Sequence, residues 1–152
     1  MTVQEEVVAL AQSAHQKDWQ AGRDVGAQTR KSNAVCRAWQ EAVKVRFPDR
    51  FHPEHRLNKT GRSQQIDLVD LHDRVAYELK SSPNNVHMEI YRDVFKALVF
   101  NLRNPDVAVQ TLVFIAPEDG IRRLGKAFPE DVAAIARQLR LELILCSISS
   151  PL

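Results

Sequence analysis

The spacing of apolar residues changes several times along the chain, and each change of period predicts an element. Apolar residues recur at helical spacing over 3–21, 32–47 and 86–103, and a Gly, Pro or Asn follows each stretch. Shorter helical pieces are expected over 118–127 and 130–139. Gly, Gln and Thr residues interrupt the periodicity between the first two helices, so a loop is expected there.

Stretches with strand character lie between and after these helices. Two of them alternate apolar and polar residues with period two, whereas the last two are continuous apolar runs, the pattern of strands buried on both faces of a parallel sheet. The predicted strands cover 51–57, 65–71, 74–81, 107–116 and 141–148. This order predicts a single α/β domain, with a helix and loop over 1–31, a core over 32–149 and a mixed central sheet flanked by helices.

The central hairpin predicts which side chains lie together. If His72-Asp73 is a two-residue turn, Leu68 pairs with Tyr77, and Asp67 pairs with Glu78. Directly opposed residues share a face of the sheet, as do residues two apart on one strand. One face therefore carries Asp67, Glu78 and Lys80, and the other carries Ile66, Leu68, Tyr77 and Leu79. Asp70 is expected on the side of Leu68, away from the two acids.

Opposed acids on paired strands repel each other, so a purely structural hairpin would not favour Asp67 across from Glu78. A divalent cation would remove this conflict, because magnesium prefers oxygen ligands and binds through one or two protein carboxylates. A nearby lysine such as Lys80 can orient a water or contact a phosphate oxygen. The alternative is a solvated hairpin face on which Glu78 and Lys80 contact each other.

The net charge of +2 conceals a basic block before this hairpin. Residues 23–62 hold ten Lys or Arg against four acids, whereas 63–152 hold ten against twelve. A basic block next to a carboxylate hairpin is typical of a surface that follows a phosphate backbone. Contacts with the DNA backbone are expected from Arg56, Lys59 and Arg62.

The acid, the E-x-K and the surrounding element order resemble the PD-(D/E)XK nuclease superfamily over roughly 32–149. The resemblance implies a restriction-endonuclease-like fold in which Asp67, Glu78 and Lys80 are catalytic and the two acids hold the metal. Ile66 stands where the family pattern has proline. The family often adds an acid from its first helix, and Glu41 is the matching metal ligand. Alternatively, Glu41 is an exposed residue that contacts Arg37 or Lys44.

The expected activity is Mg²⁺-dependent hydrolysis of phosphodiester bonds, with Mn²⁺ as a substitute and DNA favoured over RNA. Two alternatives remain: a catalytically silent nuclease-like module that binds nucleic acid, and a structural α/β interaction protein. No apolar run is long enough to span a membrane, and Cys36 and Cys146 are expected as free thiols. These features predict a cytoplasmic protein, with a homodimer or a subunit of a larger assembly as its expected forms.

Overall fold

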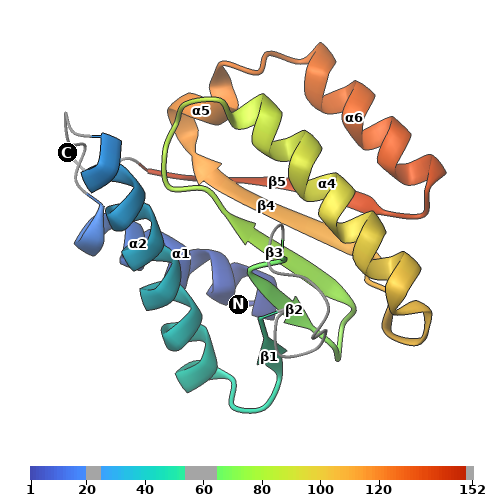
Figure 1. Cartoon of the computed structure of the whole chain (residues 1–152), viewed down its shortest axis with the longest axis horizontal. Helices are drawn as coiled ribbons and strands as arrows, with labels where there is room; N and C mark the ends of the chain where they lie inside the picture. The colour runs from blue at the N-terminus through green and yellow to red at the C-terminus, as the bar shows by residue number, and fades with distance from the viewer. Residues whose placement is uncertain (20–24, 54–64, 150–152) are drawn as a thin grey trace.

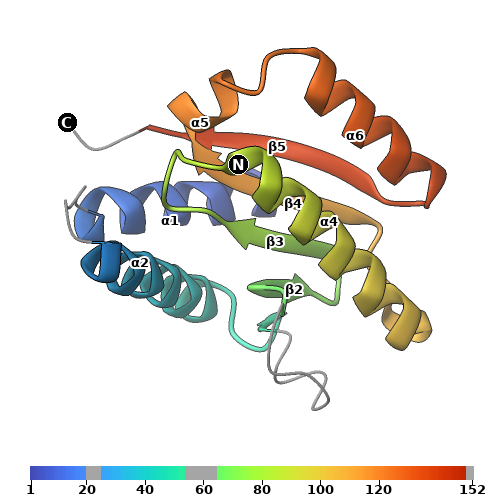
Figure 2. The same ribbon diagram turned by 45° about the horizontal axis from the view of Figure 1, so that its top comes forward.

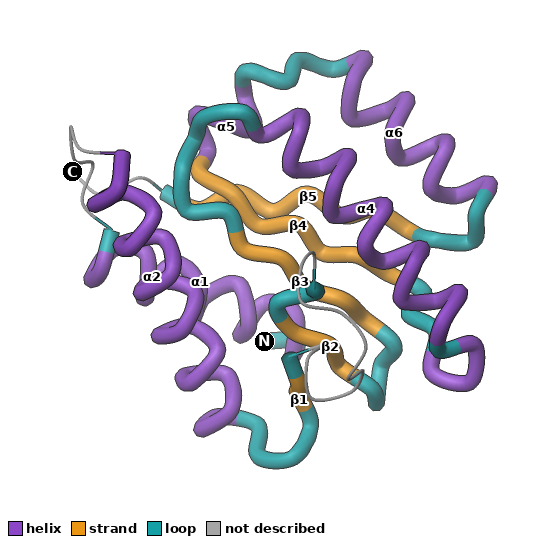
Figure 3. The backbone as a smooth tube through the Cα atoms, in the orientation of Figure 1, coloured by secondary structure: helices purple, strands orange, loops and turns teal. Residues whose placement is uncertain are grey.

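The chain folds into three layers, with a central sheet between two pairs of helices (Figures 1 and 2). The structure is a computed structural model that describes residues 1–19, 25–53 and 65–149, with the backbone alone for 25–31. Figure 3 separates its helices, strands and loops by colour. The elements are α1 (Val3–Asp18), α2 (Val25–Arg46), β1 (Phe51–His52), β2 (Leu68–Asp70), β3 (Val75–Leu79), α4 (Val86–Arg103), the 3₁₀ helix η1 (Pro105–Val107), β4 (Thr111–Pro117), α5 (Glu118–Arg122), α6 (Ala127–Gln138) and β5 (Glu142–Ile148).

The five strands lie in the order β1-β2-β3-β4-β5. The first three form an antiparallel meander, whereas β3, β4 and β5 are parallel. Parallel neighbours require a crossover, and α4 makes the one from β3 to β4, while α5 and α6 make the one from β4 to β5. The predicted α/β class with a mixed, helix-flanked sheet is therefore confirmed.

Each face of the sheet has its own apolar core. Helices α1 and α2 cover one face, where Trp39 packs with Tyr77 of β3 and Ile115 of β4. Helices α4 and α6 cover the other, where Phe100 packs with Ala76 and Phe114. Because both faces are covered, the strands in the middle of the sheet are apolar on both sides.

The second helix is longer than predicted. The sequence pattern predicts a loop before a helix that begins near Ser32, but α2 begins at Val25 and runs to Arg46. A glycine inside a helix costs only about 1 kcal/mol relative to alanine, so Gly26 does not prevent the extension. The two additional turns place Ser32 and Asn33 inside the helix rather than at its cap, where both line the cavity described below.

The predicted hairpin register is confirmed, because Leu68 pairs with Tyr77 and Asp70 pairs with Val75. The prediction that only one face of this hairpin is core is wrong. The face of Ala76 and Glu78 is covered by α4 and belongs to a second core. Ile66 also belongs to that core rather than to the side of Leu68, because it precedes β2 and the alternation holds only within a strand.

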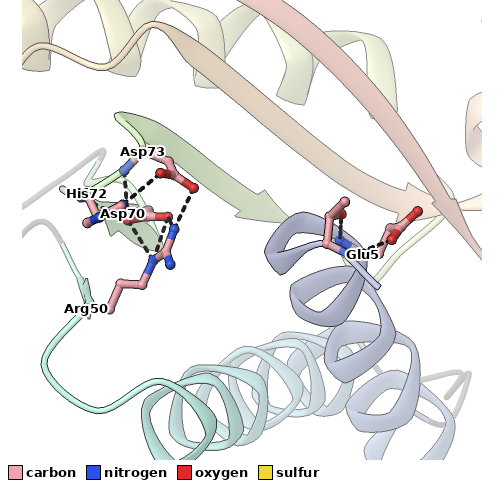
Figure 4. A network of polar contacts seen from close by, with 6 residues as sticks. Glu5, Arg50, Asp70, His72 and Asp73 are labelled. Carbon is pink, nitrogen blue, oxygen red and sulfur yellow. Dashed lines mark hydrogen bonds and ion pairs between the residues drawn. The ribbon is translucent and has the colours of Figure 1, made fainter.

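Asp70 lies on the side predicted for it and is completely buried (Figure 4). Arg50 binds it through two nitrogens, with Nη2 at 2.8 Å from Oδ2, and the same Nη2 reaches Oδ2 of Asp73 at 2.5 Å. The backbone N–H groups of His72 and Asp73 also donate to Oδ1 of Asp70. These contacts join β1 to the β2–β3 turn. Figure 4 also shows Glu5, which forms a capping box with Thr2 at the start of α1.

We expect Arg50→Ala to lower the free energy of unfolding by about 3 kcal/mol, because it leaves the buried Asp70 carboxylate without its cation. Arg46 provides the matched control, since its ion pair with Glu6 is at the surface. Arg46→Ala should cost less than about 1 kcal/mol. Urea denaturation of both variants measures the difference, and equal losses would contradict the role assigned to the buried pair.

Candidate active site

A cavity of about 230 Å³ opens at the carboxyl end of β3, between the amino-terminal half of α2 and the polar face of α4. Its lining is mostly polar and comes from four parts of the chain: Ser32, Asn33, Cys36, Asp67, Glu78, Leu79, Lys80, Ser81, Ser82, Glu89, Arg92, Asp93 and Lys96. Asp67, Glu78 and Lys80, which the hairpin register places on one face, thus line one cavity.

Asp67 is held in place by contacts on both of its sides. Its Oδ2 accepts a hydrogen bond from the backbone N–H of Leu79 at 3.0 Å. Its backbone carbonyl accepts one from Nε2 of Gln40 at 2.8 Å, which ties it to α2. The carboxylate is therefore anchored to the β3 backbone while its residue stays partly exposed to the cavity.

Glu78 is buried between β3 and α4, and its ion pair comes from α4. Nζ of Lys96 lies 2.6 Å from Oε1 of Glu78 and 3.1 Å from Oδ1 of Asp93. Burial raises the pKa of Glu78 well above its usual value, and the charges of Asp67 and Asp93 raise it further. Lys96 opposes this rise, and its own pKa is raised because the three carboxylates outweigh the effect of burial.

Asp93 shares this environment. Burial raises its pKa to about 6, although Lys96 acts in the opposite direction. Three carboxylates and one ammonium therefore interact inside the protein, which leaves an excess of negative charge when all the acids are ionised. Strongly perturbed acids grouped in a cavity are a common property of functional sites.

Lys80 lies at the rim of the same cavity. Its backbone N–H donates to the carbonyl of Ile115 at 2.8 Å, so the residue continues the β3–β4 pairing beyond the strand. Its Nζ lies 3.8 Å from Oε1 of Glu89, which itself pairs with Arg92. Burial lowers the pKa of Lys80, and Glu89 only partly reverses this effect. A lysine whose pKa is lowered is better able to accept or donate a proton near neutral pH.

Helix α2 brings a thiol to the cavity rather than the predicted acid. Cys36 lies beside Asp67, and burial together with the charges of Asp67 and Glu78 raises its pKa, which keeps the thiol protonated. Glu41 is exposed and lies one position beyond Gln40, which turns it about 100° around the helix from the Asp67 contact. It is not among the described residues that line the cavity.

The predicted nucleic-acid contacts Arg56, Lys59 and Arg62 lie in 54–64, outside the described residues. Among the residues that the structure does describe, basic side chains border the cavity at Lys80 and Arg92. Arg92 is half exposed and pairs with Glu89.

The donor chemistry of the cavity suits a hard cation such as Mg²⁺. Asp67, Glu78 and Asp93 present carboxylate oxygens that repel one another. A divalent cation bound between them would remove this repulsion. Within the described part of the chain, no three acidic, His or Cys side chains are already arranged to share one ion. Lys96 instead contacts two of the carboxylates, so a metal ion and this ammonium would compete for the same oxygens.

Asp93 and Lys96 are not among the predicted site residues, because the prediction rests on the hairpin and both residues lie on α4. The sequence signal for them is a polar stripe on this helix. Glu89, Asp93 and Lys96 follow each other at helical spacing, on a helix that comes directly after the E-x-K strand. Because this helix must pack against the E-x-K strand, its polar stripe could have been predicted to contact the acids of that strand.

No family model, curated protein or solved structure matches the chain. Within its described residues, no helix has the length and apolar character that crossing a membrane requires.

The raised pKa of Asp93 predicts how stability depends on pH. The unfolded carboxyl titrates near 3.8 and the folded one near 6, so the folded state binds more protons between these values. The free energy of unfolding should therefore fall as pH rises from about 4 to about 6. Asp93→Asn removes this loss, and from pH 4 to pH 7 the variant should gain up to about 3 kcal/mol relative to the parent.

Urea denaturation at several pH values measures this difference. Asp131→Asn is the control, because Asp131 is exposed on α6 and its removal should leave the pH dependence unchanged. Curves for the parent and Asp93→Asn that stay parallel across this pH range would contradict the assignment.

Proposed function

We propose that this chain is a Mg²⁺-dependent nuclease of the PD-(D/E)XK type that acts on DNA, and that the cavity at the end of β3 is its active site. The observation that carries the proposal is the position of Glu78. Its carboxylate is buried beside Asp67 and Asp93 in a polar cavity, an arrangement that costs folding free energy. A function that requires the acids explains why the chain contains them.

The order of the elements supports the same proposal. Helix α2 is followed by the antiparallel meander β1-β2-β3, then by α4 and by β4 parallel to β3. A helix, a three-stranded meander, a second helix and a further strand is the core that the resemblance implies. In this chain Asp67 lies just before β2, Glu78 is in β3, and Lys80 is the first residue after β3.

In the proposed mechanism Asp67 and Glu78 would hold the metal ion, and Asp93 would contribute negative charge beside them. When bound, Mg²⁺ would polarise the scissile phosphate and lower the pKa of a water molecule. Lys80 would orient that water and contact a phosphate oxygen from the rim of the cavity, a role that its lowered pKa suits. Lys96 would pair with Glu78 and Asp93 when no metal is bound and so reduce the repulsion between these acids.

The proposed substrate follows from charge. The cavity contains an excess of carboxylates, so affinity for a polyanion has to come from basic residues around it. Lys80 and Arg92 border the cavity, and the sequence between 23 and 62 contains ten basic residues. Contacts of this kind recognise phosphates and carry no information about the bases.

A second function deserves a test because Lys96 already neutralises part of the site. If the ion pairs of Lys96 with Glu78 and Asp93 are permanent, the cavity needs no metal. The chain would then be a nuclease-like module that binds nucleic acid without cleaving it. Such a module would show salt-dependent DNA affinity but neither metal binding nor turnover.

Metal binding and cleavage separate these functions. We expect Mg²⁺ and Ca²⁺ to raise the Tm of the parent protein, because each binds the folded state alone. Mg²⁺ should support cleavage of supercoiled, linear, single-stranded or branched DNA, with little turnover in Ca²⁺. Asp67→Ala should abolish both the shift in Tm and cleavage. Lys80→Ala should keep the shift while lowering the cleavage rate by several orders of magnitude, since its contact forms in the transition state.

Asp131→Asn, on the far helix α6, is the matched control for loss of an acid and should behave like the parent. A parent protein without a shift in Tm in either metal would remove the basis for the site. Cleavage by Lys80→Ala at the parent rate would show that the role proposed for this lysine is wrong.

Reversal of Arg56, Lys59 and Arg62 to glutamate should weaken binding of all DNA sequences alike. It should also reduce the slope of log affinity against log salt, by about 0.9 for each phosphate contact that is lost. The same reversals at Arg122, Arg123 and Lys126, around α5, are the control and should have less effect. Fluorescence anisotropy over a range of salt concentrations measures both sets. Equal losses would mean that the basic segment before the hairpin has no special part in binding.

A further inference from the structure

The outward face of α4 carries five apolar residues, which we call the α4 stripe: Met88, Tyr91, Phe95, Leu98 and Leu102. Four of them are strongly exposed, with Met88 at 57%, Tyr91 at 52%, Phe95 at 61% and Leu102 at 82%. The intervals between successive members are three, four, three and four residues. This is the spacing of the a and d positions of a helix that packs against another helix.

The opposite side of α4 is also apolar. Ile90, Ala97 and Phe100 are fully buried against the sheet, and the polar stripe that serves the cavity lies between the two apolar faces. Leu102 lies about four turns after the buried Val86 but is the most exposed residue of the five. A helix that is apolar on two sides is normally covered on both.

The apolar surface continues from the α4 stripe onto α6, which lies beside α4 on the same face of the sheet (Figures 1 and 2). Phe128 at the start of α6 contacts Tyr91 edge to face, with ring centroids 5.2 Å apart. Ile135 of α6 and Leu139, the residue that caps this helix, follow Phe128 at helical spacing and extend the same side, and more than half of each is exposed.

The size of this surface indicates a protein partner. Among the described residues, five of the eight exposed large hydrophobic side chains lie on α4 and α6, and a sixth, Leu139, caps the carboxyl end of α6. With roughly 150–250 Å² for a large side chain, their exposed parts amount to on the order of 500 Å². This is comparable with the largest apolar patches of monomeric proteins, which are often functional. It also supplies much of the roughly 800 Å² that each partner buries in a typical interface.

We propose that the α4 stripe is the interface through which two copies of this chain associate. A two-fold interface requires a surface that complements itself, and the stripe extends seven residues to either side of Phe95. An axis near Phe95 would bring Met88 of one copy towards Leu102 of the other. The stripe itself holds no charged residue, and the neighbouring Arg92 is already paired with Glu89, so a strongly charged partner would find no complement here.

The test is the oligomeric state of the full chain. Sedimentation velocity and light scattering over a wide concentration range should show a concentration-dependent dimer. Phe95→Glu, at the centre of the interface, should raise the dimer dissociation constant by at least about thirtyfold, and Leu102→Glu, which buries a charge against Met88 of the other copy, should also raise it. Circular dichroism checks the fold of both variants, which should be unaffected because both side chains are mostly exposed.

Val45→Glu provides the matched control, because Val45 is 78% exposed but lies on α2, away from the α4 stripe. Its dimer should match that of the parent. A parent chain that stays monomeric at every concentration overturns the proposal, as would be the case if a different protein or another segment covers the stripe. A dimer that survives both Phe95→Glu and Leu102→Glu also overturns it, because the interface would then lie elsewhere.

Discussion

The constraint on which this structure depends is the burial of a carboxylate between a strand and a helix. Glu78 points from β3 into the layer that α4 closes, so its charge is separated from water and lies near two further acids. An isolated ionised group in such a place would cost far more than any single contact provides. Lys96 supplies the opposing charge, and its ion pair with Glu78 joins α4 to β3.

The same layer shows how stability and chemistry are divided between the two cores. On the side of α1 and α2, the buried Asp70 carboxylate is well matched, since it contacts Arg50 and two backbone N–H groups. On the side of α4, the acids outnumber the ammonium that balances them. The core under α1 and α2 can thus contribute the folding free energy that the buried acids of the core under α4 cost.

The sequence was sufficient for the parts of this architecture that rest on local pattern. The period-two alternation around His72-Asp73 fixes the register of β2 and β3, because a slip by one residue would exchange their faces. The α4 boundaries also follow from pattern, since its apolar repeat begins at Val86 and ends before Asn104. Two features depend on packing between distant segments and could not be found in this way. These are the extension of α2 and the side on which Ile66 lies.

Three sides of helix α4 have different surroundings. One side packs on the sheet, the next carries Asp93 and Lys96 into the cavity, and the third carries the exposed apolar stripe. Each residue of an α-helix turns the chain by about 100°. Deletion or insertion of a single residue near its middle would therefore move every later side chain from one task to another, and no adjustment of the flanking loops could restore all three sides. This helix should consequently keep its length in related chains even where its individual residues change, whereas the loops around it are free to vary.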